Sequence, residues 1–321
     1  MINDLYKDQL MLNHPSRDWS KVVLKTVSQV LDHNKWKINS TNRRDHATYT
    51  KNNRTLEINF CHNPVKEDQR DYYITDGVVN SLDWKTITLA PEYFGVYHYN
   101  FNYVNSKPTK KFNCFINRGC EFRQSWMYQF VRRSLLDHGH ISYWCENRLG
   151  TLSASEHFEM LLIGNEIFKD EHQQLQGKIP YKNFTSSIED AILDSERTVI
   201  LETFFDDPDA NVFTEKIWRS IQLPRPWLLL SSVSSVSCLR DWGFDVFDDY
   251  IDHSYDQEPL NFKRQTMILD QLSRPIDYTD AVLEDFEQRA QRNQQLLLKL
   301  QLAWPDKFKQ ALEEIAVLEI T

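Results

Sequence analysis

Glycine is scarce in this chain of 321 residues, which contains only eight. No GxGxxG segment and no GxxxxGKS or GxxxxGKT segment occurs, which argues against a Rossmann dehydrogenase and against a P-loop enzyme. No apolar run approaches 18 residues, so the sequence predicts no membrane-spanning helix. The polar start, Met-Ile-Asn-Asp-Leu-Tyr, lacks the apolar core of a signal peptide, and we therefore expect a cytoplasmic protein.

Cysteines are few and scattered. An odd number without clustering fits reduced thiols in a cytoplasm, and no CxxC spacing or paired His/Cys set completes a zinc site. The five cysteines are Cys61, Cys114, Cys120, Cys145 and Cys238.

Charge is unevenly distributed along the chain. Residues 1–111 carry 16 Lys and Arg against 12 Asp and Glu, whereas the remainder carries 21 against 34. A basic first part could face an anionic acceptor such as nucleic acid or an acidic glycan, although an excess this small is also ordinary scatter.

Strand-like and helix-like segments alternate along most of the chain, which predicts an α/β protein with a parallel sheet covered on both faces. The polar segment 105–110 is the predicted linker between two α/β halves. We expect domains at 1–108, 109–275 and 276–321, the last one helical. The expected helices are 18–34, 122–136, 154–168, 214–222 and 234–241, with a helical tail over 260–318 broken at Pro275 and Pro305; the expected strands are 55–60, 72–75, 84–90, 111–117, 140–144, 197–204, 227–231 and 244–247.

The segment 213–219, Phe-Thr-Glu-Lys-Ile-Trp-Arg, begins a predicted helix directly after a buried strand and an acidic loop. A helix N-terminus offers free N–H groups and a positive dipole to a phosphate, and Lys216 adds a full positive charge. Glu215 can accept two hydrogen bonds from a ribose diol. The alternative is a solvated Glu-Lys pair at a helix start. Glu202, at the end of the preceding strand, is expected either to bind the donor sugar or to pair with an arginine.

A second junction of strand and helix lies about ninety residues earlier. The predicted strand 111–117 runs into a loop that contains Arg118, and Arg123 stands at the start of the next helix, shortly before Trp126. Ligands of parallel sheets lie beyond the carboxyl ends of the strands, so both junctions are predicted to meet at one edge.

The two motifs together resemble the donor-binding signature of the alpha-1,3/4-fucosyltransferases. The matching residues are Thr214-Glu215-Lys216-Ile217 and Arg123, and the segment 239–247 resembles the one that follows the Glu-Lys helix in viral and bacterial fucosyltransferase-like proteins. The resemblance covers roughly residues 109–255. It implies the glycosyltransferase B architecture, two Rossmann-like domains facing a cleft, with acceptors bound by the first half and nucleotide sugars by the second.

The resemblance implies a metal-independent, inverting glycosyltransferase whose donor is a nucleoside-diphosphate sugar, with GDP-fucose as a candidate. It implies that Glu215, beside Thr214, binds the ribose. It also implies that Lys216 and Arg123 bind the diphosphate, with Arg118 as a near neighbour. The expected acceptor-side base is Glu92. We expect no cofactor and no metal, because the acidic loop 206–209 is interpreted as solvated. The acceptor stays open between a glycan hydroxyl and a modified base in DNA, and a non-catalytic nucleotide-sugar or glycan-binding module is the other alternative.

Overall fold

The computed structural model describes part of the chain, and all structural statements below concern that part. The described residues are 37–43, 46–51, 54–59, 72–75, 78–79, 85–88, 103–116, 121–146, 178–202, 210–211 and 213–317. The expected helices 18–34 and 154–168 lie outside them.

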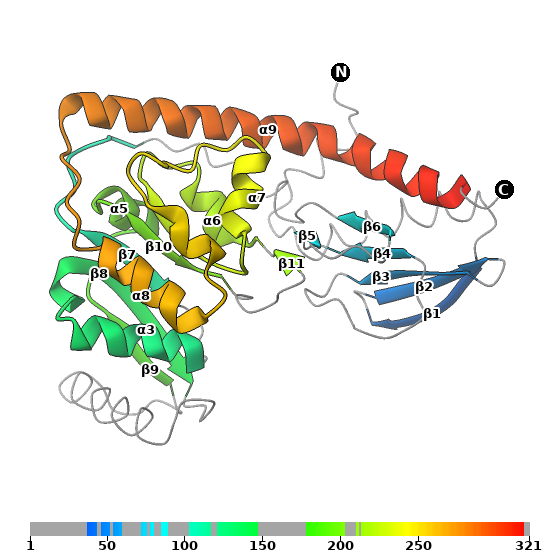
Figure 1. Ribbon diagram of the computed structural model, residues 1–321, viewed down its shortest axis with the longest axis horizontal. Helices are drawn as coiled ribbons and strands as arrows, with labels where there is room; N and C mark the ends of the chain where they lie inside the picture. Colours follow the sequence, from blue (N-terminus) through cyan, green and yellow to red (C-terminus); the bar gives the residue numbers. More distant parts are fainter. Residues whose placement is uncertain are drawn as a thin grey trace.

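The main sheet has the strand order β12-β10-β7-β8-β9 (Figure 1). Its first four strands run parallel and β9 runs antiparallel to β8. This confirms the parallel sheet predicted for the second half of the chain. The strands are β7 (Phe112–Ile116), β8 (Gly139–Glu146), β9 (Lys178–Lys182), β10 (Thr198–Leu201) and β12 (Trp227–Leu230).

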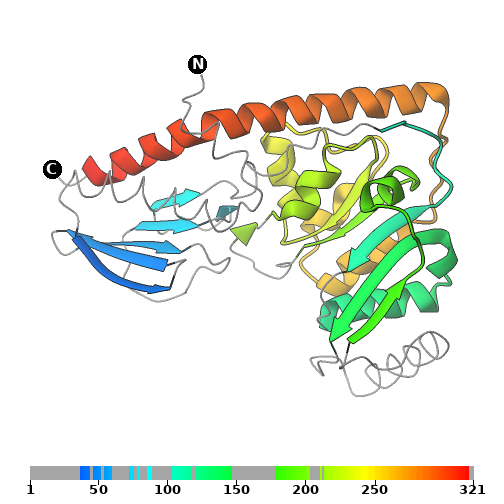
Figure 2. The ribbon, with the colours of Figure 1, turned by 180° about the vertical axis from the view of Figure 1, so that it is seen from behind.

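Every residue of β10, an interior strand, and of β12, at the edge of the sheet, is buried, which fits a parallel sheet with helices on both faces. Helices α3 and α8 cover one face and α5 and α6 the other (Figures 1 and 2). Aromatic side chains fill the core, and Trp126, Trp218 and Trp227 are fully buried in it. The helices of this unit are α3 (Glu121–Arg132), α5 (Ile188–Leu193), α6 (Glu215–Ser220), α7 (Ser235–Asp241) and α8 (Asn261–Gln271), with single turns η1 (Leu136–His138) and η2 (His253–Gln257).

The first half contains a second sheet, with the order β1-β2-β3-β4-β6. Strands β3, β4 and β6 are parallel to one another, but β1, β2 and β3 form antiparallel pairs, so this sheet is mixed. The links at 44–45 and 52–53 have two residues each, and connections this short join only antiparallel neighbours. The strands are β1 (Lys37–Arg43), β2 (His46–Lys51), β3 (Arg54–Asn59), β4 (Tyr72–Thr75) and β6 (Lys85–Thr88).

A small two-stranded sheet joins the two halves of the chain. Strand β5 (Val78–Val79) pairs antiparallel with β11 (Ala210–Asn211), which lies between β10 and α6. Asn211 is buried, and its side-chain oxygen accepts a hydrogen bond of 2.6 Å from Ser235 at the start of α7. The segment between β10 and β12 of the main unit therefore pairs with a strand of the first half.

The segment predicted as a linker is held against the main unit. Asn105 donates to the Leu283 carbonyl at 2.7 Å and accepts from Arg225 at 2.6 Å, while Ser106 accepts a second bond from Arg225. Arg225 is completely buried, and its bonds account for how a polar segment without apolar residues is fixed in place.

Two predicted features are wrong. Residues 244–247 form no strand, because the Val246 carbonyl accepts from His253 and the Phe247 N–H is bound by the Asp245 carboxylate, which removes them from any strand pairing. The helix does end before Pro275, but α9 (Asp280–Val317) continues through Pro305. A long helix absorbs one proline by losing a single backbone hydrogen bond and bending. Among the described residues, no helix is long and apolar enough to cross a membrane.

Candidate functional site

The start of α6 lies at the carboxyl end of β10, where the sequence predicted a binding site. Thr214 is the N-cap of α6, with an extended backbone. Its N–H donates to Glu202 Oε1 at 3.0 Å and its hydroxyl lies 2.5 Å from Glu202 Oε2. Glu202 therefore holds the first residue of α6 with both carboxylate oxygens.

Lys216 completes this arrangement from the first turn of α6. Its Nζ lies 3.2 Å from Glu202 Oε2 and 3.1 Å from Thr214 Oγ1. The Glu202 side chain is 0% exposed and the Lys216 side chain 23% exposed. A buried carboxylate needs such compensation, because desolvation of an unpaired charge costs several kcal/mol. Glu202 thus forms an ion pair with Lys216, which neither expected alternative included, and binding of the donor sugar by Glu202 stays a prediction.

Arg123 approaches the same edge from the other junction. It lies in the first turn of α3, is buried, and donates through Nη2 to the backbone carbonyl of Glu202 at 3.1 Å. Leu201, the last residue of β10, offers a second carbonyl at 3.5 Å. Two cationic side chains from separate helices therefore surround Glu202, one at its backbone and one at its carboxylate.

The structure brings together four of the seven residues predicted for the site, namely Arg123, Glu202, Thr214 and Lys216. Glu215 is their neighbour in the first turn of α6 and is partly exposed. Glu92 and Arg118 lie outside the described residues. Whether these two residues face the site stays a prediction.

A second arginine at this edge, among the residues that the structure describes, was not found from the sequence. Arg264 of α8 is fully buried and donates to the Ser232 carbonyl at 3.2 Å, just beyond β12. Burial lowers its pKa, although Asp256 nearby opposes this effect. Leu201 and Leu230 are paired, so the residues that follow β10 and β12 lie side by side. The only signal was a basic residue within a segment interpreted as a charged helical tail.

The start of α7 is capped by a distant carboxylate, not by the serines before it. Asp256, which is buried, accepts from the backbone N–H groups of Val236 and Ser237, each at 3.0 Å. Ser234 makes no capping bond to this helix. A carboxylate therefore lies at the start of α7, as the Glu202 carboxylate lies at the start of α6.

Arg123 and Arg264 lie on neighbouring helices. Ser125 of α3 and Gln265 of α8 are within hydrogen-bonding distance, at 3.2 and 3.4 Å for the two amide atoms. The carboxyl edge of β10 and β12 is therefore framed by three cations, Arg123, Lys216 and Arg264, and by two buried carboxylates, Glu202 and Asp256.

Within the part of the chain that the structure describes, no group of three or more His, Cys, Asp or Glu side chains is placed to hold a metal ion. No protein-family model, no curated protein and no solved structure matches this chain.

Proposed function

We propose that this protein is a glycosyltransferase that binds a nucleoside-diphosphate sugar at the carboxyl edge of β10. The observation that supports it is the convergence of Arg123, Lys216 and Glu202 from three separate elements at that edge. Residues some ninety positions apart in the sequence meet there, as the donor-binding signature requires.

In this proposal Lys216 and Arg123 neutralise the diphosphate that leaves as the glycosidic bond forms. Charge develops on that group in the transition state, and fixed cations in a site that excludes water stabilise it most effectively. Glu202 holds the ammonium of Lys216 in place before the donor arrives. Glu215, partly exposed in the same turn, binds the ribose diol.

The acceptor hydroxyl requires a base, and we assign this role to Glu92 in the first half of the chain. A positioned base contributes about 10²–10⁴-fold to such reactions. The mixed sheet of the first half, joined to the donor side through β5 and β11, is the proposed acceptor side. The acceptor is a glycan hydroxyl or a hydroxyl on a modified DNA base.

Nucleotide binding is tested first, by thermal shift with GDP, UDP, ADP and CMP. A ligand at one hundred times its Kd stabilises the folded state by about 2.7 kcal/mol, so the preferred base is visible as the largest shift. Calorimetry on Glu215→Gln then tests the ribose contact, with Glu284→Gln, an exposed glutamate on α9, as the matched control.

We expect Glu215→Gln to weaken binding by about 1.5–3 kcal/mol, the range for hydrogen bonds to charged groups, while Glu284→Gln binds as the wild type does. Equal affinities in both variants would remove the ribose assignment. If no nucleotide shifts the melting temperature, the donor site itself is rejected. Binding without transfer to any glycan or DNA acceptor would identify a non-catalytic module.

A further inference from the structure

Helix α9 is 38 residues long, and only part of this length packs on the main unit. Its buried residues Phe286, Ala290, Asn293 and Leu297 are spaced by four, three and four positions, which places them on one face. That face packs on the main unit. Asn293 donates to the carbonyls of Ile221 and Asp245, at 3.2 and 3.0 Å, so polar contacts also fix the rotation of the helix.

Beyond this packed part the helix continues toward the first half of the chain. Residues 301–317 add about 25 Å at 1.5 Å per residue. The distal end of α9, drawn in red, lies over the first sheet, and α9 contacts β6 (Figures 1 and 2). One continuous helix therefore contacts both the main unit and the first sheet.

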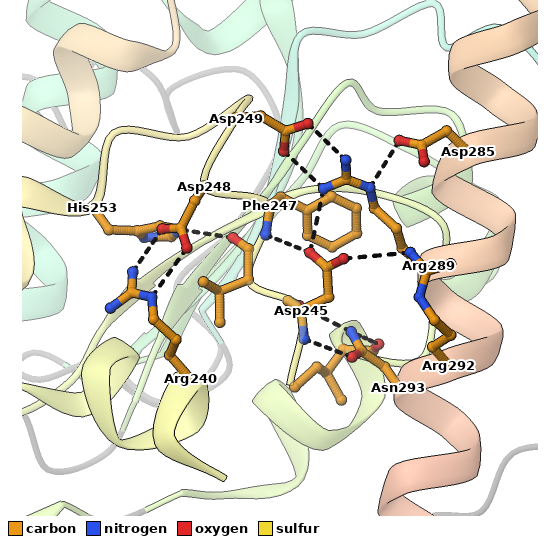
Figure 3. Close-up of polar contacts among 12 residues, drawn as sticks. Arg240, Asp245, Phe247, Asp248, Asp249, His253, Asp285, Arg289, Arg292 and Asn293 are labelled. Atoms are coloured by element: carbon orange, nitrogen blue, oxygen red, sulfur yellow. Dashed lines mark hydrogen bonds and ion pairs between the residues drawn. The ribbon is translucent and has the colours of Figure 1, made fainter. Parts of the chain in front are cut away.

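A cluster of charges fixes α9 where it crosses the main unit (Figure 3). Arg289 of α9 forms two hydrogen bonds with Asp249, at 2.7 and 2.6 Å. It also reaches Asp245 at 3.3 Å and Asp285, one turn earlier on α9, at 2.8 Å. We name these four residues the Arg289 clasp. The guanidinium lies over the rings of Phe247 and Tyr250, and the neighbouring carboxylates raise the pKa of Arg289 against the effect of burial.

Three members of the clasp, Asp245, Asp249 and Arg289, line one side of a hollow of about 510 Å³ between α7, the segment 243–249 and α9. The other side holds a second ion pair, in which Arg240 binds both carboxylate oxygens of Asp248 at 3.0 and 2.6 Å. This pair joins α7 to the same segment and includes no residue of α9. It therefore provides a matched control for the clasp.

We propose that α9 is a rigid arm that fixes the position of the first sheet relative to the carboxyl edge of the main sheet, with the Arg289 clasp setting its direction. Two contacts connect the first half of the chain to the main unit. The arm passes from the clasp to β6, and the β5–β11 pairing joins the first half to the chain between Glu202 and Thr214.

The proposal is tested by electron–electron distance measurements on the full chain. One spin label is attached through a bioorthogonal amino acid at Lys85, the first residue of β6, and a second at Asp137 of η1. Two variants perturb the arm in different ways. Arg289→Met removes the clasp, and Lys299→Pro, at an exposed position of α9, kinks the helix between the clasp and the first sheet. Their controls are Arg240→Met and Lys299→Ala.

We expect a single narrow distance distribution in the wild type and both controls, and a broadened or displaced one in Arg289→Met and Lys299→Pro. A wild-type distribution in Lys299→Pro would overturn the arm, and one in Arg289→Met would overturn the role of the clasp. Near-ultraviolet circular dichroism confirms that each variant is folded. If Arg289→Met is not, Asp249→Asn, which removes one half-exposed partner of Arg289, replaces it with the same expected direction.

Discussion

The pair formed by Glu202 and Lys216 can be measured as a coupling free energy. The Glu202 carboxylate is completely buried and accepts two hydrogen bonds from Thr214 in addition to that from Lys216. Lys216→Met removes the counter-charge and leaves a buried carboxylate with its Thr214 contacts alone. Breaking a buried pair in this way costs about 3–5 kcal/mol, and we expect about 3 kcal/mol because the ammonium is partly exposed.

Glu202→Gln has a smaller expected effect. The amide oxygen still accepts from Thr214 N–H, and the ammonium of Lys216 can turn toward solvent, so the loss is about 1–2 kcal/mol. In the double variant neither charge remains, and its free energy of unfolding should lie close to that of Glu202→Gln. The cycle then gives a coupling of about 3 kcal/mol, at the upper end of the range for residues in contact.

Urea unfolding at pH 7 and 25 °C measures all four proteins, with equal m-values as the check that the same surface is exposed. Lys263→Met, at an exposed lysine of α8, is the control for loss of a lysine and should change the stability by less than about 0.5 kcal/mol. A coupling below about 0.5 kcal/mol would refute the buried ion pair.

Three further predictions concern the main unit. Arg225→Lys should destabilise the protein by about 2–4 kcal/mol and speed tryptic cleavage after Lys110, because lysine cannot replace the five bonds of the buried guanidinium, including that to Asn105. Unchanged urea midpoints and cleavage would contradict this. Burial lowers the pKa of His253 in the folded protein, so the free energy of unfolding should decrease as the pH falls below about 6.5, where the unfolded chain takes up a proton and the folded one does not. His253→Gln should flatten this pH dependence of the urea midpoint, and an identical pH dependence in the variant would exclude the assignment. Gly139→Ala should cost about 1–3 kcal/mol in a melting experiment, because its Cβ would lie 2.5 Å from the buried ring of Phe112; an unchanged melting temperature would show that the ring has room to move.

The sequence predicted the main unit well because its signals are local. The buried strands β10 and β12 are continuous apolar runs bounded by polar loops, and Thr214 is a favourable N-cap that marks the start of α6. The strand predicted at 244–247 was wrong for the opposite reason. Its apolar residues face the core without strand pairing, and the bonds that fix it come from His253 and from its own Asp245.

The structure brings four of the predicted residues to one edge, but the sequence did not predict the contacts among them. Residues after a strand and at a helix start can be placed at one edge by the rule for parallel sheets, so Arg123 and Lys216 were found. Arg264 was missed because its position depends on how α8 packs against β12, and no local pattern records that packing. The pairing of Lys216 with Glu202 likewise depends on a distance that the sequence does not contain.

The Glu202 carboxylate and a bound diphosphate would compete for the ammonium of Lys216, and this competition can be measured. A structural N-cap needs only Thr214, so a buried glutamate beside it is an expensive addition unless its charge serves a purpose. If Glu202 holds Lys216 ready for a diphosphate, a bound nucleotide shares the ammonium, and the coupling measured by the cycle should shrink by about 1 kcal/mol or more when the cycle is repeated with saturating GDP. If GDP leaves the coupling unchanged, Lys216 serves the stability of the fold alone, and any donor phosphates at this edge are held by groups other than Lys216, with Arg123 as the first to test.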